Sequence, residues 1–346
     1  MSAMTTPVSV IMPVLNEQTH LATSVQGVLD QHYAGDLEIV LAVGPSTDRT
    51  REIADELAAD DPRIRVVDNP SGTTPDALNL AIAATRHPIV VRVDAHGELA
   101  PDYITTAVEL LERTGAANVG GLMDAQGTTA FQQAVAIAYT SRLGLGGGAF
   151  HLHDTPEGAA DSVFLGVFRR DALVAVGGYD PDLLRAQDWE LNLRLRQAGE
   201  QVWFSPALRV VYRPRSSVKA LAKQFFRTGQ WRREVIRRHP ESASLRYLAP
   251  PALVGGLAVG KLAGLVGLVP RTPRWLLLGW LVPLGYLLGV VAGAAAMPRQ
   301  MPAAVRARLP FVLAVMHLAW GSGFVVGLRE DERHRRDAAP RPAAQA

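Results

Sequence analysis

The 346-residue sequence predicts an α/β fold with a mainly parallel mixed sheet, followed by a C-terminal region of transmembrane helices. Two observations support this prediction. Up to about residue 245, short apolar runs typical of strands alternate with helical patterns, as in βαβ units. Beyond that point, charged residues almost disappear from three long apolar stretches. We therefore expect a folded domain over residues 1–245, a membrane domain of two or three helices over 246–328 and a disordered basic tail over 329–346.

The predicted elements of the first domain follow a regular order. Apolar, β-branched runs predict strands, while the "STD" that opens one helix and the proline near the first turn of another are typical helix starts. We predict strands at residues 8–15, 37–43, 64–69 and 88–94, and helices at residues 19–29, 47–58 and 74–85. Sheets of this kind bind ligands at the carboxyl ends of their parallel strands.

Polar residues lie at the ends of three of these strands. Asn16 and Glu17 come after the first strand, and a loop that begins at Gly44 comes after the second. Asp94 ends the fourth strand, in the run "IVVRVDAH". Because the strands are expected to be parallel, we predict that these residues lie at one ligand-binding edge of the sheet.

Two common nucleotide-binding motifs are absent from the sequence, which limits the kinds of ligand that this edge could bind. No G-x-G-x-x-G follows the first strand and no G-x-x-x-x-G-K-[ST] occurs, so the usual backbone cradles for a dinucleotide or a triphosphate are missing. This argues against a Rossmann-type oxidoreductase. A bound phosphate would instead need a divalent cation, Mg²⁺ or Mn²⁺, held by Asp94 together with His96. The alternative is that Asp94 only caps the turn after its strand.

A second acidic group opens a helix in "QDWELNLRLRQAG". Asp188 and Glu190 are two positions apart, so their side chains point to different sides of the helix. The helix dipole keeps a carboxylate at this end ionised, which suits Asp188 to act as a general base; the alternative is a simple helix cap. We expect Glu190 to pair with Arg194, four residues further on.

The apolar stretches lie at residues 248–270, 275–297 and 309–328. A membrane span needs about 20 apolar residues, and the last two stretches contain no Asp, Glu, Lys or Arg. The first has prolines and glycines that favour a broken or interfacial helix, and a large buried helical core is the alternative for all three. Arginines flank the last stretch on both sides, so the positive-inside rule cannot hold at both ends if that stretch crosses the membrane.

Composition limits the partners further. A net charge of +2 is too small to predict nucleic acid as a general partner. The absence of cysteine excludes disulfides and thiolate metal sites and fits a reducing compartment. The apolar start of the sequence lacks the basic flank of a signal peptide. Lys and Arg residues are mixed with aromatic residues in "KQFFRTGQWRREVIRRHP", which suits the headgroup layer on the cytoplasmic side of a membrane.

Taken in order, the motifs "PVLNE", "GPSTDRT", "DALNLAI", "DAH", "GGYD", "QDWE" and "QFFRTGQW" resemble those of the family 2 inverting glycosyltransferases. Within that family, "VDAHGELAPDY", "NVGG", "RRDALVAVGGYD" and "PRSSVKAL" are most similar to the membrane-anchored, succinoglycan-type glucosyltransferases of exopolysaccharide assembly. The resemblance extends over residues 7–328. Each motif alone is short, but seven in the same order are specific.

The resemblance implies a GT-A fold for the catalytic domain at 1–245, a nucleotide-diphosphate sugar donor with a UDP-sugar favoured, and Mg²⁺ or Mn²⁺ as cofactor. It implies that Asp94 matches the first Asp of the family's D-x-D element, with His96 at the place of the second. Asp188 matches the catalytic base. The residues implied to lie along the nucleotide sugar are Pro13, Asn16, Glu17 and Gly44.

This sequence departs from the family pattern at two places. Val43 stands where many members have an Asp that contacts the base, and Thr228 replaces the Trp of the Q-x-x-R-W element of processive synthases. The second departure favours the addition of single sugars. Contacts with the acceptor or the diphosphate are expected from Gln187, Gln224, Arg227 and Trp231. For the last two, anchoring of the helix at the membrane surface is an equal alternative.

We therefore expect a multi-pass membrane enzyme with a cytoplasmic catalytic domain and a lipid-linked saccharide acceptor. Inversion requires one in-line displacement, in which Asp188 takes the proton of the acceptor hydroxyl while Asp94 and the cation stabilise the leaving diphosphate. The alternative is a non-catalytic membrane scaffold or a transporter-like protein with a degenerate nucleotide-binding domain. Such a protein would account for the apolar stretches but not for the ordered acidic motifs.

Overall fold

The computed structural model describes residues 5–145, 147–297 and 300–328, and these fall into two compact units. The first unit contains the chain up to Asp124 and Gly148–Tyr212. The second contains Ala125–Gly147 and the described residues from 213 to 328. The limits of these units differ from the expected boundary at residue 245, so the division into a catalytic and a membrane domain stays a prediction. The expected tail at 329–346 lies outside the described residues.

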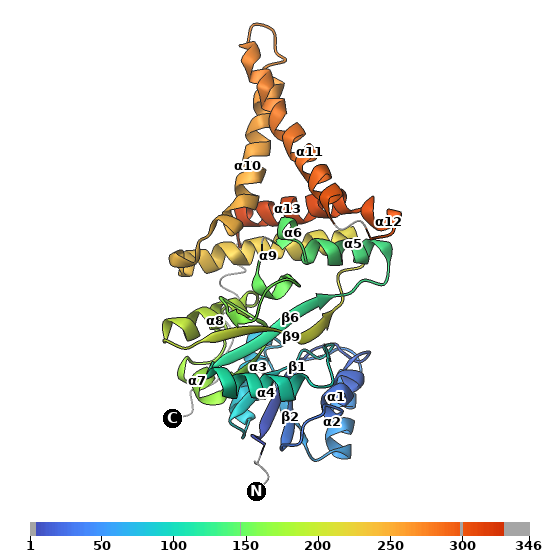
Figure 1. Ribbon diagram of the computed structural model, residues 1–346, viewed down its shortest axis with the longest axis vertical. Coiled ribbons are helices and arrows are strands. Elements are labelled where there is room, and N and C mark those ends of the chain that lie inside the picture. Colours follow the sequence, from blue (N-terminus) through green and yellow to red (C-terminus); the bar gives the residue numbers. More distant parts are fainter. Residues whose placement is uncertain (1–4, 146, 298–299, 329–346) are drawn as a thin grey trace. The chain divides into compact units, whose positions relative to one another are not determined.

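Four parallel strands form one half of the sheet in the first unit, in the order β3–β2–β1–β4 (Figure 1). They are β1 (Val8–Val14), β2 (Leu37–Val43), β3 (Ile64–Asp68) and β4 (Ile89–Arg92), and the helices between them are α1 (Leu21–Leu29), α2 (Thr50–Asp60) and α3 (Thr74–Ala84). The predicted βαβ order is confirmed. In the register of the pairs, Val14 lies opposite Val43, which lies opposite Asp68. The loops after β1 and β2 therefore leave the sheet at one edge.

Antiparallel strands continue the sheet beyond β4, so that it is mixed. The described strands of this half are β5 (Glu98–Leu99), β6 (Asn118–Ala125), β7 (Gly158–Ala159), β8 (Phe164–Arg169) and β9 (Val202–Tyr212). The path from β4 runs through β8, β6 and β9 to β5, and β7 pairs with β9. Gly121 makes the close approach of β6 to β9 possible, since a Cβ there would lie 1.7 Å from the carbonyl oxygen of Leu208.

Helices cover both faces of the sheet. Alternate side chains of a strand point to opposite faces, so Val10 and Met12 belong to one apolar cluster and Ile11 to the other. The first cluster includes residues of α1 and of α4 (Tyr103–Thr114), and the second includes residues of α3 and of α8 (Gln187–Gln197). The short helix α7 (Arg170–Ala175) and the 3₁₀ turn η1 (Ala149–His151) complete the described helices of this unit. Burial on both faces explains why β1 and β2 read as continuous apolar runs.

The described part of the second unit is helical. Its helices are α5 (Ala130–Tyr139), α6 (Arg142–Leu145), α9 (Val218–Arg238), α10 (Leu245–Val266), α11 (Leu281–Ala296), α12 (Ala303–Arg306) and α13 (Leu309–Val326), with 3₁₀ turns η2 (Pro240–Ser242) and η3 (Arg274–Trp280). Pro250 and Pro251 lie inside α10, which continues through both as one helix. The expected break at these prolines is therefore wrong.

Three helical segments of this unit are long and apolar enough to cross a membrane: Leu245–Val266, Arg274–Ala296 and Ala303–Val326. They correspond to the three predicted apolar stretches. Of the residues in their most apolar windows, 17%, 6% and 33% are buried. Large side chains such as Leu281 and Leu288 are more than half exposed, which a buried helical core would not show. The exposed apolar surface instead suits lipid.

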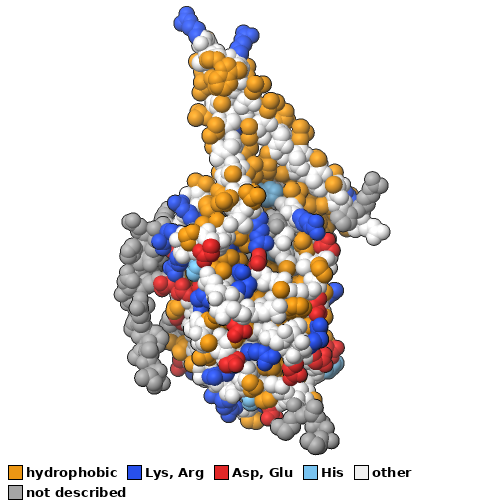
Figure 2. All heavy atoms as spheres, turned by 60° about the vertical axis from the view of Figure 1, so that its left-hand side comes forward, with side chains coloured by type: hydrophobic (Ala, Val, Ile, Leu, Met, Phe, Trp, Pro, Cys, Tyr) orange, Lys and Arg blue, Asp and Glu red, His pale blue; other side chains and the backbone are white. Residues whose placement is uncertain are grey.

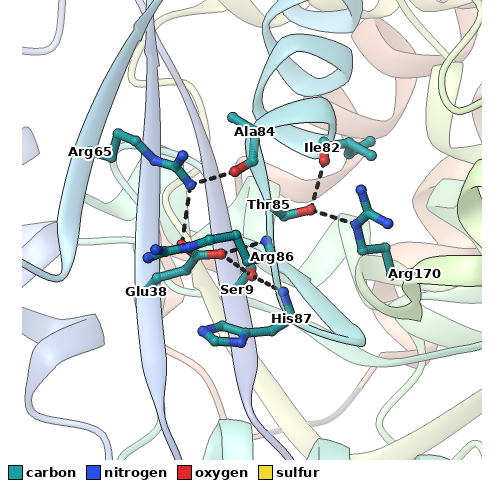
Figure 3. Close-up of polar contacts among 9 residues, drawn as sticks. All are labelled: Ser9, Glu38, Arg65, Ile82, Ala84, Thr85, Arg86, His87 and Arg170. Atoms are coloured by element: carbon teal, nitrogen blue, oxygen red, sulfur yellow. Dashed lines mark hydrogen bonds and ion pairs between the residues drawn. The ribbon is translucent and has the colours of Figure 1, made fainter.

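At the amino ends of β1 and β2, a buried carboxylate joins several segments of the first unit (Figure 3). Glu38 accepts hydrogen bonds from the Ser9 hydroxyl at 2.6 Å and from the Arg86 backbone and Nε at 2.7 and 2.9 Å. It also forms an ion pair with Arg65 at 3.2 Å. Burial alone would raise the pKa of Glu38, but these hydrogen bonds and the charge of Arg86 lower it below its ordinary value. The carboxylate thus fixes the turn between α3 and β4.

Replacing Glu38 with Gln keeps the shape of the side chain but removes the charge that these donors stabilise. We expect the free energy of unfolding at pH 7 to fall by about 1–3 kcal/mol, measured by thermal unfolding of the full chain in detergent. Because the folded-state pKa is lowered, the carboxylate stabilises the fold above the ordinary glutamate pKa, and this contribution disappears as the pH falls through the lowered value. The difference between the two proteins should therefore shrink below about pH 4.

The matched control is Glu109→Gln on the exposed side of α4, which should change the stability by less than about 0.5 kcal/mol. A Glu38→Gln protein that is destabilised equally at pH 7 and pH 3 would contradict the role assigned to the charge.

Candidate active site

Hydrogen bonds between two loops shape the edge of the sheet where β1 and β2 end. The Asn16 carboxamide oxygen accepts from the Thr47 backbone N–H at 2.8 Å, and the Asn16 N–H donates to the Ser46 hydroxyl at 3.0 Å. The Glu17 N–H donates to the Thr50 hydroxyl at 2.7 Å. Asn16 has a φ of 56°, a left-handed conformation that Asn tolerates better than most residues. The polar residues predicted at this edge therefore lie in two loops that hold each other.

Asp48 strengthens the same junction. Its carboxylate accepts from the Thr50 hydroxyl at 2.5 Å and from the Gln18 N–H at 3.3 Å, and the hydrogen bond from Thr50 lowers the pKa of Asp48. Gly44 begins the second loop, and a Cβ on it would lie 3.0 Å from the Leu15 side chain. Pro13 is half-buried in β1. Pro13, Asn16, Glu17 and Gly44, the predicted nucleotide-binding residues, thus all lie at the carboxyl ends of β1 and β2 or in the loops that follow these strands.

A buried arginine connects the two predicted acidic residues. Arg92, the last residue of β4, is 4% exposed, and its NH2 and Nε lie 3.1 and 3.3 Å from Oδ1 of Asp94. Its NH1 donates to Oδ1 of Asp188, in the first turn of α8. The Oδ2 atoms take no part in these contacts. The structure therefore brings Asp94 and Asp188, which are far apart in the sequence, to the two sides of one guanidinium group.

The charges of this cluster are strongly coupled. Burial raises the pKa of Asp188, and the negative charge of Asp94 acts in the same direction, while Arg92 lowers it; the result lies above the ordinary value. Burial would lower the pKa of Arg92, but the two carboxylates raise it, so the guanidinium stays protonated. A carboxylate with a raised pKa is a stronger base than an ordinary aspartate.

The aromatic ring of Tyr179 completes the surroundings of Arg92, with its centroid 5.7 Å from the guanidinium carbon. Two reciprocal hydrogen bonds fix the backbone of Tyr179, because Asn79 in α3 accepts from its N–H at 2.8 Å and donates to its carbonyl at 2.7 Å. Gly178 has a φ of 67°, and a Cβ on it would lie 2.6 Å from Oδ1 of Asn79. The "DALNL" and "GGYD" motifs therefore hold one another and place Tyr179 beside Arg92.

The predicted metal ligands have protein partners. His96 is exposed, and its Nδ1 lies 2.9 Å from Oε1 of Glu17, whereas Asp94 contacts Arg92. Within the described residues, no three His, Asp or Glu side chains form a cluster that could hold a metal ion. A cation here would take most of its ligands from the diphosphate and water. Asp94 could be its single protein ligand, because Mg²⁺ is often held by one or two carboxylates together with substrate phosphates.

The remaining predicted residues divide between the two units. Glu190 forms its ion pair with Arg194 at 2.6 Å, as predicted. Gln187 begins α8, one residue before Asp188. Gln224, Arg227 and Trp231 belong to α9 of the second unit, where Arg227 is exposed and Trp231 is 8% exposed. Their contacts with an acceptor or a diphosphate stay predictions.

Comparison with known proteins decides the family. A model described as "Glycosyl transferase family 2" matches residues 9–174. The succinoglycan biosynthesis protein ExoA of Rhizobium meliloti is 33% identical to this chain over 329 residues, which cover 91% of the chain and 93% of that protein. The chain belongs to glycosyltransferase family 2.

Two glycosyltransferases of lower sequence identity also match. A Methanococcus voltae glycosyltransferase, which by its name acts on a dolichyl N-acetylglucosaminyl phosphate, is 25% identical over 67% of this chain and 74% of its own length. The solved structure of a mannosyltransferase from Pyrobaculum calidifontis is 21% identical, with a TM-score of 0.61 over 92% of this chain and 88% of that one. At that identity the likeness concerns the fold, and it confirms the expected GT-A fold.

The sequence arguments missed Arg92 and Tyr179. Arg92 is the one charged residue in the apolar run "PIVVRV", and a charged side chain in a strand buried on both faces needs a partner. That signal was available in the sequence. Nothing in the sequence pointed to a role for Tyr179 except that it belongs to the "GGYD" motif.

The close contact at Gly178 can be tested against its neighbour Gly177. Both glycines have a positive φ, so alanine at either position costs about 1 kcal/mol of conformational strain. Only at Gly178 would the new Cβ also displace Asn79, because nothing lies within 4 Å of a Cβ on Gly177. We expect Gly178→Ala to lower both the Tm and the transferase activity clearly more than Gly177→Ala does. Equal effects of the two substitutions would show that the contact with Asn79 does not matter.

Proposed function

We propose that this family 2 glycosyltransferase transfers a single sugar, with inversion, from a nucleotide-diphosphate sugar to a lipid-linked saccharide at the cytoplasmic face of a membrane. The pathway would be the synthesis of exopolysaccharide or another cell-envelope glycan. Support for the pathway comes from the relative named for succinoglycan biosynthesis, which matches nearly the whole chain. Support for the membrane comes from the three apolar helical segments. The observation that carries the chemistry is the shared contact of Asp94 and Asp188 with Arg92.

In the proposed reaction, Asp188 accepts the proton of an acceptor hydroxyl. The acceptor oxygen forms a bond to the anomeric carbon while the bond from that carbon to the phosphate oxygen breaks, and the nucleoside diphosphate leaves from the opposite face. The raised pKa of Asp188 suits this role, since a base is most effective when its pKa lies near the working pH. One base and one group that stabilises the leaving charge are sufficient, unlike the two carboxylates of a glycosidase.

Arg92 and Asp94 act on the leaving side in this proposal. Arg92 holds the two carboxylates in place and compensates their negative charge, so that a diphosphate is not repelled from the site. A divalent cation would be held by Asp94, with His96 beside it, and would neutralise the diphosphate. The Pyrobaculum neighbour, which was solved with GDP-mannose and Mn²⁺, supports such a cofactor. Because Val43 takes the place of a base-contacting Asp, the favoured UDP-sugar needs a direct test.

The decisive assay incubates membranes that contain the full chain with radiolabelled UDP-, GDP- and dTDP-sugars. We expect transfer of label from one donor class to a lipid-extractable product, and Asp188→Asn should reduce the rate by about 10²–10⁴-fold while the enzyme still binds the donor. The matched control is Asp60→Asn at the exposed end of α2, which should leave the rate unchanged. Normal transfer by Asp188→Asn would refute its role as the base, and no transfer from any sugar nucleotide would refute the proposed activity.

A pH profile tests how Arg92 acts. A general base works when it is deprotonated, so kcat should fall as the pH drops through the raised pKa of Asp188. Arg92 lowers that pKa, and its removal in Arg92→Gln should therefore shift the acid limb of the profile upward by about one pH unit or more. Arg92→Lys retains the positive charge and should shift the limb less. A fall in kcat with no shift of the limb would indicate that Arg92 only supports the fold.

A further inference from the structure

Helices α9 and α13 of the second unit lie lengthwise along each other (Figure 1). Glycines allow the close contact on both sides. A Cβ on Gly323 would lie 1.9 Å from the carbonyl oxygen of Phe226, and a Cβ on Gly229 would lie 2.0 Å from that of Trp320. Residues 226 and 229 of α9 contact residues 320 and 323 of α13, whereas residues 230 and 233, further along α9, contact residues 325 and 327, so the two helices are parallel. Both run across the direction of α10 and α11 in Figure 1.

Side chains of α9 also bind the end of α13. The Gln230 amide donates to the carbonyl of Gly327 at 2.7 Å, and the Arg233 guanidinium donates to the carbonyl of Val325 at 2.7 Å. The last carbonyls of a helix have no partner within the helix and carry a partial negative charge, which a cation satisfies well. The end of α13 is therefore bound to the middle of α9 by polar contacts as well as by packing.

The charge of α9 decides where this pair can lie in a membrane. Eight of its 21 residues are charged: Lys219, Lys223, Arg227, Arg232, Arg233, Glu234, Arg237 and Arg238. They extend from the first turn to the last. If α13 stood across the bilayer, α9 beside it would place several of these charges in hydrocarbon, at about 2.5–3.5 kcal/mol each on the insertion scale. A helix of this charge is instead typical of the headgroup layer.

We propose that α13 does not cross the membrane but lies in the membrane interface beside α9, and that only the hairpin of α10 and α11 crosses. The apolar surface of α13 does not require a span, because protein covers part of it. A third of its apolar window is buried, and the Nε2 of His317 in its middle donates to the carbonyl of Leu143 in α6 at 2.7 Å. The remaining apolar side chains would face the acyl chains below the headgroups.

The α10–α11 hairpin has the features of a true membrane span. At about 1.5 Å per residue, the 22 residues of α10 measure about 33 Å, which matches the hydrocarbon thickness. Gly256, Gly260 and Gly264 face η3 and α11, and a Cβ on Gly260 would lie 2.7 Å from the carbonyl of Gly279. Such spacing of small residues is typical of helix pairs in lipid. Figure 2 shows hydrophobic side chains along the hairpin and Lys or Arg side chains at its tip.

With α13 in the interface, the arginines at both of its ends can satisfy the positive-inside rule, which they could not do if α13 crossed the membrane. Arginines flank α13 at both ends of its sequence: Arg299, Arg306 and Arg308 before it, and Arg329, Arg333, Arg335 and Arg336 after it. With α13 in the interface, both groups lie on the same side as α9. The loop at the tip of the hairpin carries only Arg271 before η3 begins at Arg274. The positive-inside rule then places both groups, and the C-terminus, in the cytoplasm. This inference does not depend on the proposed sugar transfer.

The lack of cysteine makes the topology directly measurable. We would introduce single cysteines as Pro270→Cys at the tip of the hairpin, Ala304→Cys between α11 and α13, and Ala344→Cys near the C-terminus, and label intact cells with a membrane-impermeant maleimide. Pro270→Cys should be labelled in intact cells, and the other two only after the membrane is opened. The original chain is the unlabelled control. Labelling of Ala344→Cys but not Ala304→Cys in intact cells would show that α13 crosses the membrane and overturn the proposal.

Spin labels provide a second measurement that requires no cell fractionation. Phe311, Leu318 and Val325 are exposed and seven residues apart, so labels at these cysteine positions lie on one side of α13. In lipid vesicles, relaxation by oxygen and by a polar nickel complex should place all three labels at equal depth. The matched control is α11, with labels at Leu281, Leu288 and Ala295, where adjacent positions should differ in depth by about 10 Å. The same depth gradient in α13 as in α11 would overturn the proposal.

Discussion

The guanidinium of Arg92 is the contact on which the candidate site depends. Two partly buried carboxylates, Asp94 and Asp188, would repel each other, and a diphosphate would add further negative charge. The buried arginine compensates them and fixes both in one geometry. Its own position follows from the strand, because β4 is paired on both sides and cannot shift relative to the sheet. The electrostatics of the site thus rest on a single side chain at the end of one strand.

Around this contact, pairs of short motifs from different parts of the chain hold each other by hydrogen bonds. Asn79 in α3 holds the backbone of Tyr179, and the loop after β1 holds the loop after β2 through Asn16 and Glu17. At the opposite ends of the same strands, Glu38 binds the turn that leads into β4. Each of these contacts joins segments that are far apart in the sequence, so several independent contacts fix the edge of the sheet that carries the site. This rigidity suits a site that must hold an acceptor and a donor in line.

In the second unit, the corresponding constraint is the charge of α9. By hydropathy alone, α13 is a candidate membrane span, since its segment is nearly as apolar as that of α11. Both helices contact α10, but only α13 also packs along its length on α9, a helix with eight charged residues. The membrane position of an apolar helix is therefore set by the element to which it is bound as much as by its own composition.

The sequence by itself determined the βαβ order, the location of Asn16, Glu17 and Asp94 at the ends of their strands, and the family. Apolar periodicity, strand ends and ordered motifs are local properties, and these are what a sequence records. Only the tertiary structure decided that Arg92 connects Asp94 with Asp188, that His96 faces Glu17, and that α13 lies along α9. These are contacts between segments many residues apart, and their geometry depends on how strands pair and helices pack rather than on any local pattern.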